Sequence, residues 1–293
     1  MTIIDGKKIS EDILNEISLE VEQRTNKGYK TPHLAAILVG DDGPSQTYVN
    51  SKINACKEVG FKSSLFKYDN NITEKKLLEE IGKINNDDDI DGFIVQLPLP
   101  NSINQENIFN CVNPNKDVDG FHPLNYGKMT LGIDSFVPAT PHGILELIKR
   151  YKIDLNGKKC LVIGRSQIVG RPISILLSQS KEFCNATVTL AHSRTLNLNE
   201  LTLDADVIIS AIGRPEFLTE NMVKEGSIII DVGISRVKDD NSNKGYKIVG
   251  DVDFKNVSKK ASFITPVPGG VGPMTITMLL DNTLKAARLS VLD

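Results

Sequence analysis

A short apolar stretch that runs directly into a glycine turn is the feature that most limits how this chain can fold. Residues 160–163, Cys-Leu-Val-Ile, have the composition of a parallel strand buried on both faces. Gly164 ends this stretch, and apolar residues between Ile168 and Leu177 then follow with helical spacing. A strand, a glycine turn and a helix in this order form the corner at which dinucleotide-binding domains hold phosphate. We therefore expect such a corner at residues 164–172.

The glycine pattern of this corner departs from the usual fingerprint, Gly-x-Gly-x-x-Gly. Ser166 stands where the middle glycine is expected, and a fold alone does not establish binding. The next predicted strand, residues 186–195, ends in hydroxyl side chains and Arg194 instead of the acid that usually binds the ribose of NAD. Together with Arg165 and Ser166, these donors suit a 2′-phosphate, which favours NADP as the cofactor.

The N-terminal part of the chain alternates predicted strands with amphipathic helices, which indicates a parallel α/β domain. The strands are expected at residues 34–39, 61–68 and 92–97, and the helices at residues 10–24, 46–59 and 73–85. In parallel sheets the site lies at the carboxyl ends of the strands. Gln96 and the loop after Val39 are therefore expected to face one crevice.

The C-terminal part continues this alternation. It is expected to open with a helix that has Thr140 as its N-cap and Pro141 at its first position. Further buried strands are predicted at residues 207–211 and 227–232, and each leads into a glycine at which a cofactor could approach the backbone.

Three segments are predicted from composition more than from period. Residues 113–127 are expected to form a long functional loop, and residues 239–245 a polar surface turn. The prolines of residues 265–275 fix the backbone, so we expect a rigid crossing between two domains. A last helix at about residues 275–289 is expected to return to the first domain.

Composition excludes several classes of protein as a first choice. The 293 residues carry a net charge of −3, which argues against a nucleic-acid or membrane-surface partner. The polar N-terminus does not resemble a signal peptide, and no apolar stretch is long enough to span a bilayer. The four cysteines are scattered, which is typical of reduced thiols in the cytoplasm, and the histidines lack metal-ligand spacing.

Two short motifs could carry chemistry. Tyr48, Lys52 and Cys56 share one helical face without an acid to pair with the lysine. A lysine held dry beside a phenol can act as an acid or a base, although a solvated surface lysine explains the same spacing. Residues 116–120, Lys-Asp-Val-Asp-Gly, offer a carboxylate that could bind a planar N–H pair bidentately, or they could form an Asx-turn with solvated charges.

The motifs together identify a resemblance that covers the chain from end to end. The chain resembles the bifunctional methylenetetrahydrofolate dehydrogenase/methenyltetrahydrofolate cyclohydrolase family. The matching stretches are residues 48–52, 95–100, 116–121, 138–141, 164–172 and 264–275. Of these, residues 264–275, Ile-Thr-Pro-Val-Pro-Gly-Gly-Val-Gly-Pro-Met-Thr, are the most specific.

The resemblance implies roles for individual residues. Lys52 would be the catalytic acid/base, tuned by Tyr48 and hydrogen-bonded to Gln96, and Asp119 would hold the pterin ring. Arg165, Ser166 and Ser193 would hold the 2′-phosphate of NADP, with Gly164 and Ile234 also at the cofactor. Tyr48, Lys52, Gln96, Leu97, Asp119, Pro266 and Gly270 would contact the folate. Similar proteins are homodimers.

The resemblance also implies an α/β fold of two domains with the active-site cleft between them. A parallel α/β folate-binding catalytic domain would comprise residues 1–139, completed by the helix at residues 274–293. A Rossmann-type NADP-binding domain would comprise residues 140–273. Two other functions remain open at this stage: an NADP-dependent dehydrogenase of another small metabolite, and a non-catalytic NADP-binding sensor.

Overall fold

The computed structural model describes residues 1–239 and 245–290, and these form two compact α/β units, each with its own parallel sheet. Unit 1 comprises Met1–Ser10 and Thr140–Thr275, and unit 2 comprises Glu11–Ala139 and Ile276–Asp293. The expected fold class, a two-domain α/β protein with parallel sheets, is confirmed.

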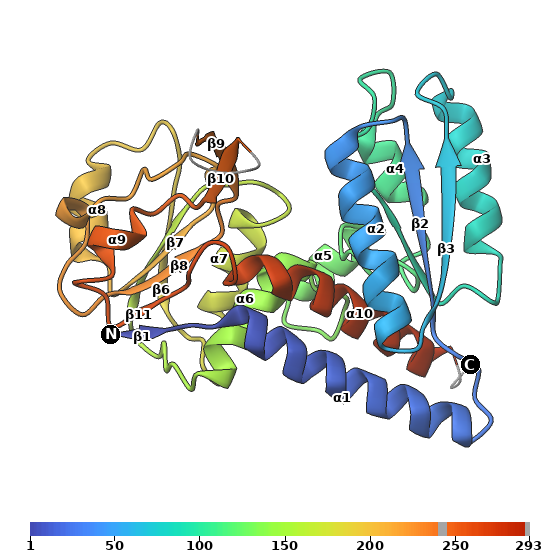
Figure 1. The fold of residues 1–293 in the computed structure, drawn as a ribbon, viewed down its shortest axis with the longest axis horizontal. Coiled ribbons are helices and arrows are strands. Elements are labelled where there is room, and N and C mark those ends of the chain that lie inside the picture. The colour runs from blue at the N-terminus through green and yellow to red at the C-terminus, as the bar shows by residue number, and fades with distance from the viewer. Residues whose placement is uncertain (240–244, 291–293) are drawn as a thin grey trace. The chain divides into compact units, whose positions relative to one another are not determined.

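The sheet of unit 2 has three parallel strands in the order β3-β2-β4, which are Lys62–Tyr68, His33–Val39 and Gly92–Val95. Every residue of β2 is buried, as expected for a central strand covered on both faces. Because side chains alternate along a strand, Ala35, Ile37 and Val39 share a face, and they pack in one cluster with apolar residues of α3 (Glu74–Asn85) and α4 (Gln105–Cys111). Helix α2 (Gly43–Glu58) packs against β2 and β3 (Figure 1).

Two long helices join segments that are far apart in the sequence. Helix α1 (Gly6–Asn26) and helix α10 (Val271–Leu289) lie side by side in unit 2, where Arg288 of α10 forms an ion pair with Glu20 of α1. The Arg24 guanidinium also donates to the carbonyl of Ala287. These contacts attach the C-terminal helix to the part of α1 that belongs to unit 2.

The sheet of unit 1 has six strands, all parallel, in the order β1-β11-β8-β7-β5-β6. These strands are Thr2–Ile3, Phe263–Ile264, Ile228–Asp231, Val207–Ser210, Lys159–Ile163 and Thr187–Ala191. Helices α8 (Leu198–Asp204) and α9 (Phe254–Val257) lie on one face of this sheet, and α6 (Ala139–Arg150) and α7 (Gly170–Ser178) lie on the other (Figure 1).

The order of these strands reverses at β5. The chain passes from β5 to β6 on one side and then returns to β7 on the other side of β5. This reversal is the topological switch point of a doubly wound sheet, and ligands of such sheets bind outside the carboxyl ends of the strands at that point.

The two units of the structure differ from the predicted domains at the first ten residues. Met1–Ser10 belongs to unit 1, because Thr2 and Ile3 pair with Phe263 and Ile264 at the edge of the six-stranded sheet. Two-residue strands carry too little period to be recognised in a sequence.

Three local predictions also need correction. The expected loop at residues 113–127 ends in a helix, α5 (Pro123–Thr130), whose N-cap is His122. Thr140 lies inside α6, which begins at Ala139, and its hydroxyl bonds to the hydroxyl of Thr275. The last helix begins at Val271, because the first turn of a helix accepts a proline.

The polar turn predicted at residues 239–245 falls largely outside the described residues, which omit residues 240–244. The flanking segments form an antiparallel pair that the sequence analysis missed, β9 (Ser235–Lys238) with β10 (Tyr246–Val249).

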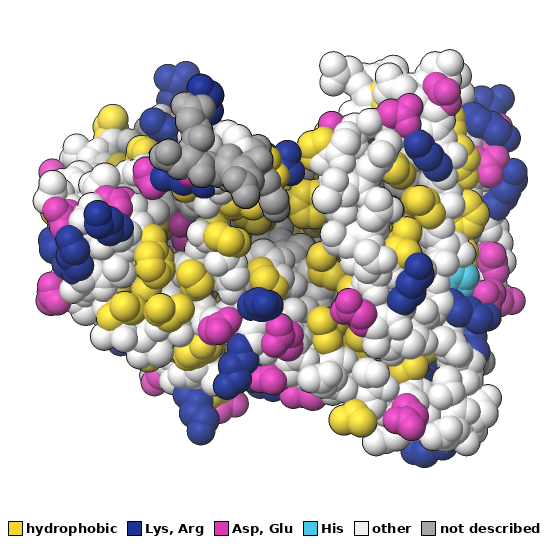
Figure 2. Space-filling view, in the orientation of Figure 1, with side chains coloured by type: hydrophobic (Ala, Val, Ile, Leu, Met, Phe, Trp, Pro, Cys, Tyr) yellow, Lys and Arg dark blue, Asp and Glu magenta, His cyan; other side chains and the backbone are white. Residues whose placement is uncertain are grey.

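In the described part of the chain, no helix combines the length and the apolar composition that crossing a membrane requires. On the face shown in Figure 2, basic and acidic side chains are interspersed, in agreement with the small net charge of −3.

Candidate active site

Helix α2 carries the lysine expected to act as the acid/base. The helix begins after Asp42, whose carboxylate accepts hydrogen bonds from the N–H and the hydroxyl of Ser45, with Pro44 in the first turn. Lys52 lies on this helix, partly buried, and its Nζ donates to Oε1 of Gln96 at 3.1 Å. The predicted contact between Lys52 and Gln96 is present.

Gln96 is held so that its amide oxygen faces the lysine. Its backbone N–H continues the ladder beyond β4 by donating to the carbonyl of Ile37 at 2.9 Å. Its side-chain Nε2 donates to the carbonyl of Leu97 at 2.7 Å. With the amide nitrogen bound in this way, the amide oxygen is left as the acceptor for Lys52.

Burial changes the proton affinity of the two charged groups at this site. Burial lowers the pKa of Lys52, and the Asp119 carboxylate opposes this shift. Burial raises the pKa of Asp119, and the charge of Lys52 opposes that shift in turn. The neutral amine of Lys52 is therefore reached at a lower pH than that of a solvated lysine, as a general base requires.

The other two residues on this face of α2 differ in exposure. Tyr48, one turn before Lys52, is 50% exposed. Cys56, one turn after Lys52, is fully buried, and burial raises the pKa of its thiol to about 12. Cys56 is thus part of the core, whereas Tyr48 is accessible to a ligand.

The loop that carries Asp119 is fixed by its neighbours. Asp117 is buried, and its carboxylate accepts hydrogen bonds from the N–H groups of Phe121 and His122 and from Nδ2 of Asn125. The two interpretations of the Lys-Asp-Val-Asp-Gly motif therefore apply to different residues. Asp117 forms the structural turn, although buried and not solvated, and Asp119 is the carboxylate that interacts with Lys52.

Two further features hold this loop from its other side. Nδ2 of Asn282, from α10, donates to the carbonyls of Val118 and Val137 at 2.8 and 2.9 Å. Gly120 has a positive φ of 72°, and a Cβ there would lie 2.7 Å from the nitrogen of Pro138. The position of Asp119 is thus set by contacts on both sides of the loop.

In unit 1, the glycines of the predicted phosphate corner are required by close packing. Gly164 has a φ of 115°, and a Cβ there would lie 2.3 Å from the carbonyl oxygen of Ala211. A Cβ on Gly170 would lie 1.9 Å from the carbonyl oxygen of Gly164. The two glycines therefore allow the turn after β5 to pack closely against the start of α7 and against the loop after β7.

Ser166 has a role that explains why it replaces the middle glycine. Its Oγ accepts hydrogen bonds from the N–H groups of Val169 and Gly170 at 3.1 and 3.3 Å. These N–H groups precede or begin α7, so the hydroxyl satisfies them and keeps its own proton for donation to a ligand. Arg165, next to it, is exposed.

The turn after β6 lies beside this corner, because Ile163 of β5 and Ala191 of β6 are paired neighbours. His192 shapes the turn: its N–H donates to Oγ1 of Thr195, and its Nδ1 accepts from the N–H of Arg194. The side chains of Ser193 and Arg194 are exposed. Hydroxyl and guanidinium donors from two adjacent strand ends thus lie at the same edge of the sheet.

The remaining predicted residues divide between the units. Ile234 is 49% exposed, and its Cδ1 would lie 3.4 Å from a Cβ at Gly272. Pro266 and Gly270 belong to unit 1, and the other predicted folate contacts, including Leu97, belong to unit 2. The structure therefore brings Lys52, Gln96 and Asp119 together, but it does not group Pro266 and Gly270 with them within one unit.

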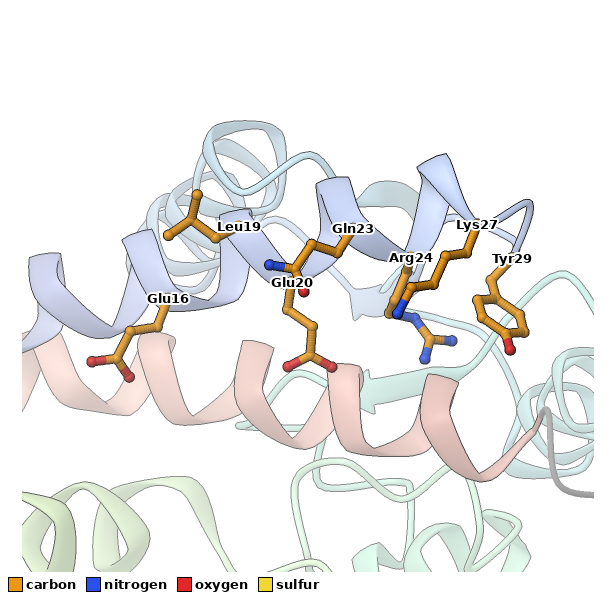
Figure 3. A pocket seen from close by; sticks show the side chains of 7 residues that line it. All are labelled: Glu16, Leu19, Glu20, Gln23, Arg24, Lys27 and Tyr29. Atoms are coloured by element: carbon orange, nitrogen blue, oxygen red, sulfur yellow. The ribbon is translucent and has the colours of Figure 1, made fainter.

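A surface groove along α1 is separate from these residues. It is lined by Glu16, Leu19, Glu20, Gln23, Arg24, Lys27 and Tyr29 (Figure 3). Glu20 and Arg24 are already bound to α10, and neither Lys52 nor Asp119 contributes to the lining. Across residues 1–239 and 245–290, no three His, Cys, Asp or Glu side chains cluster as a metal site would require.

The sequence analysis missed several polar residues that support the site. Asp117, His192, Asp231 and Asp251 bind backbone N–H groups of loops at strand ends. An Asx-turn was considered for the motif containing Asp117, but nothing in the sequence around Asp251 distinguishes a buried carboxylate from an exposed one.

Comparisons with known proteins agree with this geometry. Residues 4–119 match the family model of the tetrahydrofolate dehydrogenase/cyclohydrolase catalytic domain, and residues 138–291 match the model of its NAD(P)-binding domain. The chain is 60% identical over 286 residues to the bifunctional protein FolD of Christiangramia forsetii, covering 98% of this chain and 96% of the relative. It is 58% identical over 289 residues to that of Flavobacterium johnsoniae, covering 99% and 98%.

Solved structures give the same result. The bifunctional FolD methylenetetrahydrofolate dehydrogenase/cyclohydrolase of Campylobacter jejuni superposes with a TM-score of 0.93 at 49% identity, covering 99% of both chains. The methylenetetrahydrofolate dehydrogenase-cyclohydrolase of Trypanosoma brucei, solved with NADP and an inhibitor, has a TM-score of 0.93 at 35% identity, covering 100% of this chain and 99% of its own. The chain therefore belongs to the tetrahydrofolate dehydrogenase/cyclohydrolase family.

Proposed function

We propose that Lys52 is the acid/base of this bifunctional folate enzyme, that Asp119 holds the folate, and that unit 1 binds NADP through Arg165, Ser166 and Ser193. The chain is a methylenetetrahydrofolate dehydrogenase and a methenyltetrahydrofolate cyclohydrolase. The observation that supports the residue assignment is the partly buried set in unit 2, in which Nζ of Lys52 donates a hydrogen bond to Oε1 of Gln96 at 3.1 Å and the charges of Lys52 and Asp119 interact.

The dehydrogenase step needs positioning and no proton acceptor. NADP, when bound, accepts the hydride that leaves the methylene carbon of the folate. The folate cation that remains is stabilised by its two adjoining ring nitrogens, so no proton is transferred in this step. A site without a His–Asp pair is sufficient for this chemistry.

The cyclohydrolase step does need proton transfer. Water adds to the methenyl carbon and loses a proton, which the neutral amine of Lys52 accepts. The ring then opens as the carbon–nitrogen bond breaks: the resulting ammonium of Lys52 returns its proton to the leaving ring nitrogen, and the hydroxyl on the former methenyl carbon releases its proton to solvent as the formyl carbonyl forms. Gln96 holds Lys52 throughout by accepting its hydrogen bond, and 10-formyltetrahydrofolate is the product.

Asp119 supplies the anchor for the pterin. A carboxylate can accept two parallel N–H bonds from the amidine-like edge of a pterin, as it does from arginine. Burial raises the pKa of Asp119, and the charge of Lys52 opposes this shift toward the ionised form that the binding requires. Tyr48, half exposed one turn before Lys52, is available to line the same ligand, and Leu97, Pro266 and Gly270 are proposed as further folate contacts.

The donors of unit 1 fit the 2′-phosphate of NADP. Arg165 and Ser193 are exposed at the ends of two adjacent strands, and Ser166 retains a donatable proton. Gly164 and Gly170 keep the turn narrow, and Ile234 offers exposed apolar surface for the cofactor.

We also propose that the enzyme is a cytoplasmic homodimer. The resemblance to homodimeric relatives supports the dimer. One chain has a mass of 32.2 kDa, and light scattering at micromolar concentration should give twice this mass. A cytoplasmic location agrees with four scattered cysteines that are all free thiols.

One assay tests the function. The purified protein is mixed with methylenetetrahydrofolate and NADP, and the absorbance of NADPH and of the methenyl species is followed. We expect NADPH to form and the methenyl species to be consumed. A dehydrogenase of another metabolite would produce neither signal, and a cofactor sensor would bind NADP without turnover.

A further inference from the structure

A fully buried carboxylate in unit 1 gathers the loop that follows β7. Asp251 has no exposed surface. Its Oδ2 accepts hydrogen bonds from the N–H of Ile212 at 2.8 Å, from the N–H of Gly213 at 3.3 Å and from the hydroxyl of Ser210 at 3.2 Å. Its Oδ1 accepts from the N–H of Arg214 at 2.8 Å. One side chain thus fixes three consecutive peptide groups at the end of a strand.

A second buried carboxylate holds Asp251 in place. Asp231, at the end of β8, accepts hydrogen bonds from the N–H groups of Asp251 and Val252, each at 2.9 Å. It also accepts from the N–H of Gly233, next to Ile234, at 2.9 Å. The two aspartates therefore connect the loop after β7, the loop after β8 and the segment at residues 250–252.

Two glycines let the carboxylates approach the backbone this closely. A Cβ on Gly250 would lie 1.9 Å from Oδ2 of Asp231, and a Cβ on Gly233 would lie 2.2 Å from Oδ1 of Asp251. Any larger residue at either position would displace a carboxylate. The arrangement is thus built into the backbone, and it is not a chance contact of flexible side chains.

The loop fixed by Asp251 lies at the switch point of the sheet. β7 and β6 flank β5 on opposite sides, so the loops after β5 and β7 border the crevice where doubly wound sheets bind nucleotides. The two loops are in direct contact, because a Cβ on Gly164 would lie 2.3 Å from the carbonyl oxygen of Ala211. Residues 211–214 are therefore one wall of that crevice.

We propose that Asp251 is a positioning residue for the dinucleotide: it holds residues 212–214 in the shape that receives the cofactor, without contacting the cofactor itself. Its oxygens are occupied by protein donors, and its burial excludes a ligand. This inference rests on the proposed use of NADP by unit 1. It assigns Asp251 to a part of the cofactor site that does not recognise the 2′-phosphate.

The Asp251→Asn substitution tests this role. The amide replaces one acceptor oxygen by an N–H₂ group that faces backbone N–H groups, so residues 212–214 must move. We expect kcat/KM for NADP and for NAD to fall by the same factor, at least about tenfold. Hydrolysis of methenyltetrahydrofolate, which needs no NADP, should keep its rate. Removing a residue that binds the 2′-phosphate would affect NADP alone, so an equal loss for both dinucleotides indicates a different role.

A matched control and a milder variant separate positioning from general damage. Asp253→Ala removes an aspartate two residues away that caps α9 through the N–H of Asn256, and it should leave kcat/KM for NADP unchanged although it lowers the thermal stability. Ser210→Ala removes one donor to Asp251 and keeps the carboxylate. It should lower kcat/KM for both dinucleotides by about two- to fivefold with the fold intact.

The outcomes are distinguishable. If wild type fails to reduce NADP with methylenetetrahydrofolate, the proposed function is wrong. If wild type is active but Asp251→Asn and Ser210→Ala retain wild-type kcat/KM for NADP, Asp251 has no positioning role. An effect on NADP alone would also overturn the inference. If Asp251→Asn does not fold, the Ser210→Ala measurement decides.

Discussion

The candidate residues of the two units differ in their access to water. In unit 2, Lys52 and Asp119 are removed from solvent far enough that burial shifts the pKa of each. In unit 1, Arg165, Ser166 and Ser193 are exposed at strand ends. The difference follows from the work each set is proposed to do. Proton transfer near neutral pH needs a lysine whose charge is destabilised, whereas recognition of a phosphate needs donors that a ligand can reach.

Burial of a charged pair has a cost that the structure offsets locally. Moving a lysine or a carboxylate out of water costs several kcal/mol for each ion after relaxation, of the order found in buried ion pairs. Gln96 accepts a hydrogen bond from Lys52, and the opposite charges of Lys52 and Asp119 favour each other. In unit 1 the corresponding requirement is a close approach of backbone segments, which only glycine allows at Gly164 and Gly170.

The largest expected effect comes from removing the partly buried amine of Lys52. Lys52→Met should reduce methenyl hydrolysis by about 10²–10⁴-fold, because methionine can neither accept nor return a proton. Hydride transfer needs no proton acceptor, so part of the dehydrogenase activity should remain and the methenyl species should accumulate. Its absorbance over time is the measurement, and Lys57→Met, on an exposed position of the same helix, is the control. Methenyl hydrolysis at the wild-type rate in the Lys52 variant would show that another group transfers the proton.

Removing the partly buried carboxylate of Asp119 should have the next largest effect. Asp119→Ala should raise KM for methylenetetrahydrofolate by about 10–100-fold, since charged hydrogen bonds contribute about 1.5–3 kcal/mol. The dissociation constant of NADP, measured by titration calorimetry, should not change. Asp88→Ala removes an exposed carboxylate of the same unit and should alter neither quantity. Normal folate kinetics in the Asp119 variant would remove it from the folate site.

An exposed donor should contribute less than a buried one. Arg165→Ala should raise KM for NADP by about tenfold, because solvent screens an exposed charge. KM for NAD, which lacks the 2′-phosphate, should stay the same. Lys181→Ala, an exposed cation elsewhere in unit 1, serves as the control in the same steady-state assay. An equal rise for NADP and NAD would mean that Arg165 does not recognise the 2′-phosphate.

A last effect concerns stability, not activity, and appears in both units. Burial raises the pKa of Asp117 in unit 2 and of Asp231 in unit 1, each from 3.8 to about 7. A carboxyl group whose pKa is higher in the folded state than in the unfolded state stabilises the fold when it is protonated. This contribution is fully present at pH values below the unfolded-state pKa, and it is lost as the pH rises through the folded-state pKa of about 7. Urea unfolding at pH 5 and pH 7.5 should therefore show a loss of roughly 1–2 kcal/mol from each group.

Substitution separates the two contributions to this pH dependence. Asp117→Asn and Asp231→Asn each remove one titrating group, so each should flatten part of the dependence between pH 5 and pH 7.5. Asp88→Asn should leave the dependence as in wild type. If the Asp117 and Asp231 variants keep the full wild-type slope, both carboxylates are already ionised at pH 5.

The sequence predicted what depends on local pattern. Residues 34–39 and 160–163 are continuous apolar runs, and both became buried parallel strands. The strand pattern also placed Gln96 and the loop after Val39 at the same edge of a parallel sheet, whereas the Lys52–Gln96 contact itself was implied by the family resemblance and is present in the structure.

What the sequence could not predict depends on distant partners. Thr2 and Ile3 form a strand only because Phe263 and Ile264 lie beside them. His122 is the N-cap of α5, and its ring nitrogen accepts a hydrogen bond from the N–H of Leu124. Histidine is not among the preferred N-cap residues, so the sequence did not indicate that a helix begins here. Asp251 is buried by loops from other strands, and its own neighbours in the chain give no sign of that burial.

The interleaving of the two units along the chain has a consequence for biosynthesis. The sheet of unit 1 cannot be completed until Phe263 and Ile264 have been synthesised, because Thr2 and Ile3 pair with them at the edge of the sheet. Unit 2 is completed later, because it includes residues of α10 from Ile276 onward. The carbonyls of Val118 and Val137 obtain the amide of Asn282 only when the last helix leaves the ribosome.

A chain of this design cannot fold one domain at a time as it is synthesised, which is the usual sequence of events for multidomain proteins. Helix α10 ends unit 1 with Val271–Thr275 and continues in unit 2 from Ile276, so the same late segment completes both. A product truncated before this helix leaves both units unfinished, with apolar surface exposed to chaperones and proteases. Burial of both cores therefore requires that synthesis has passed α10.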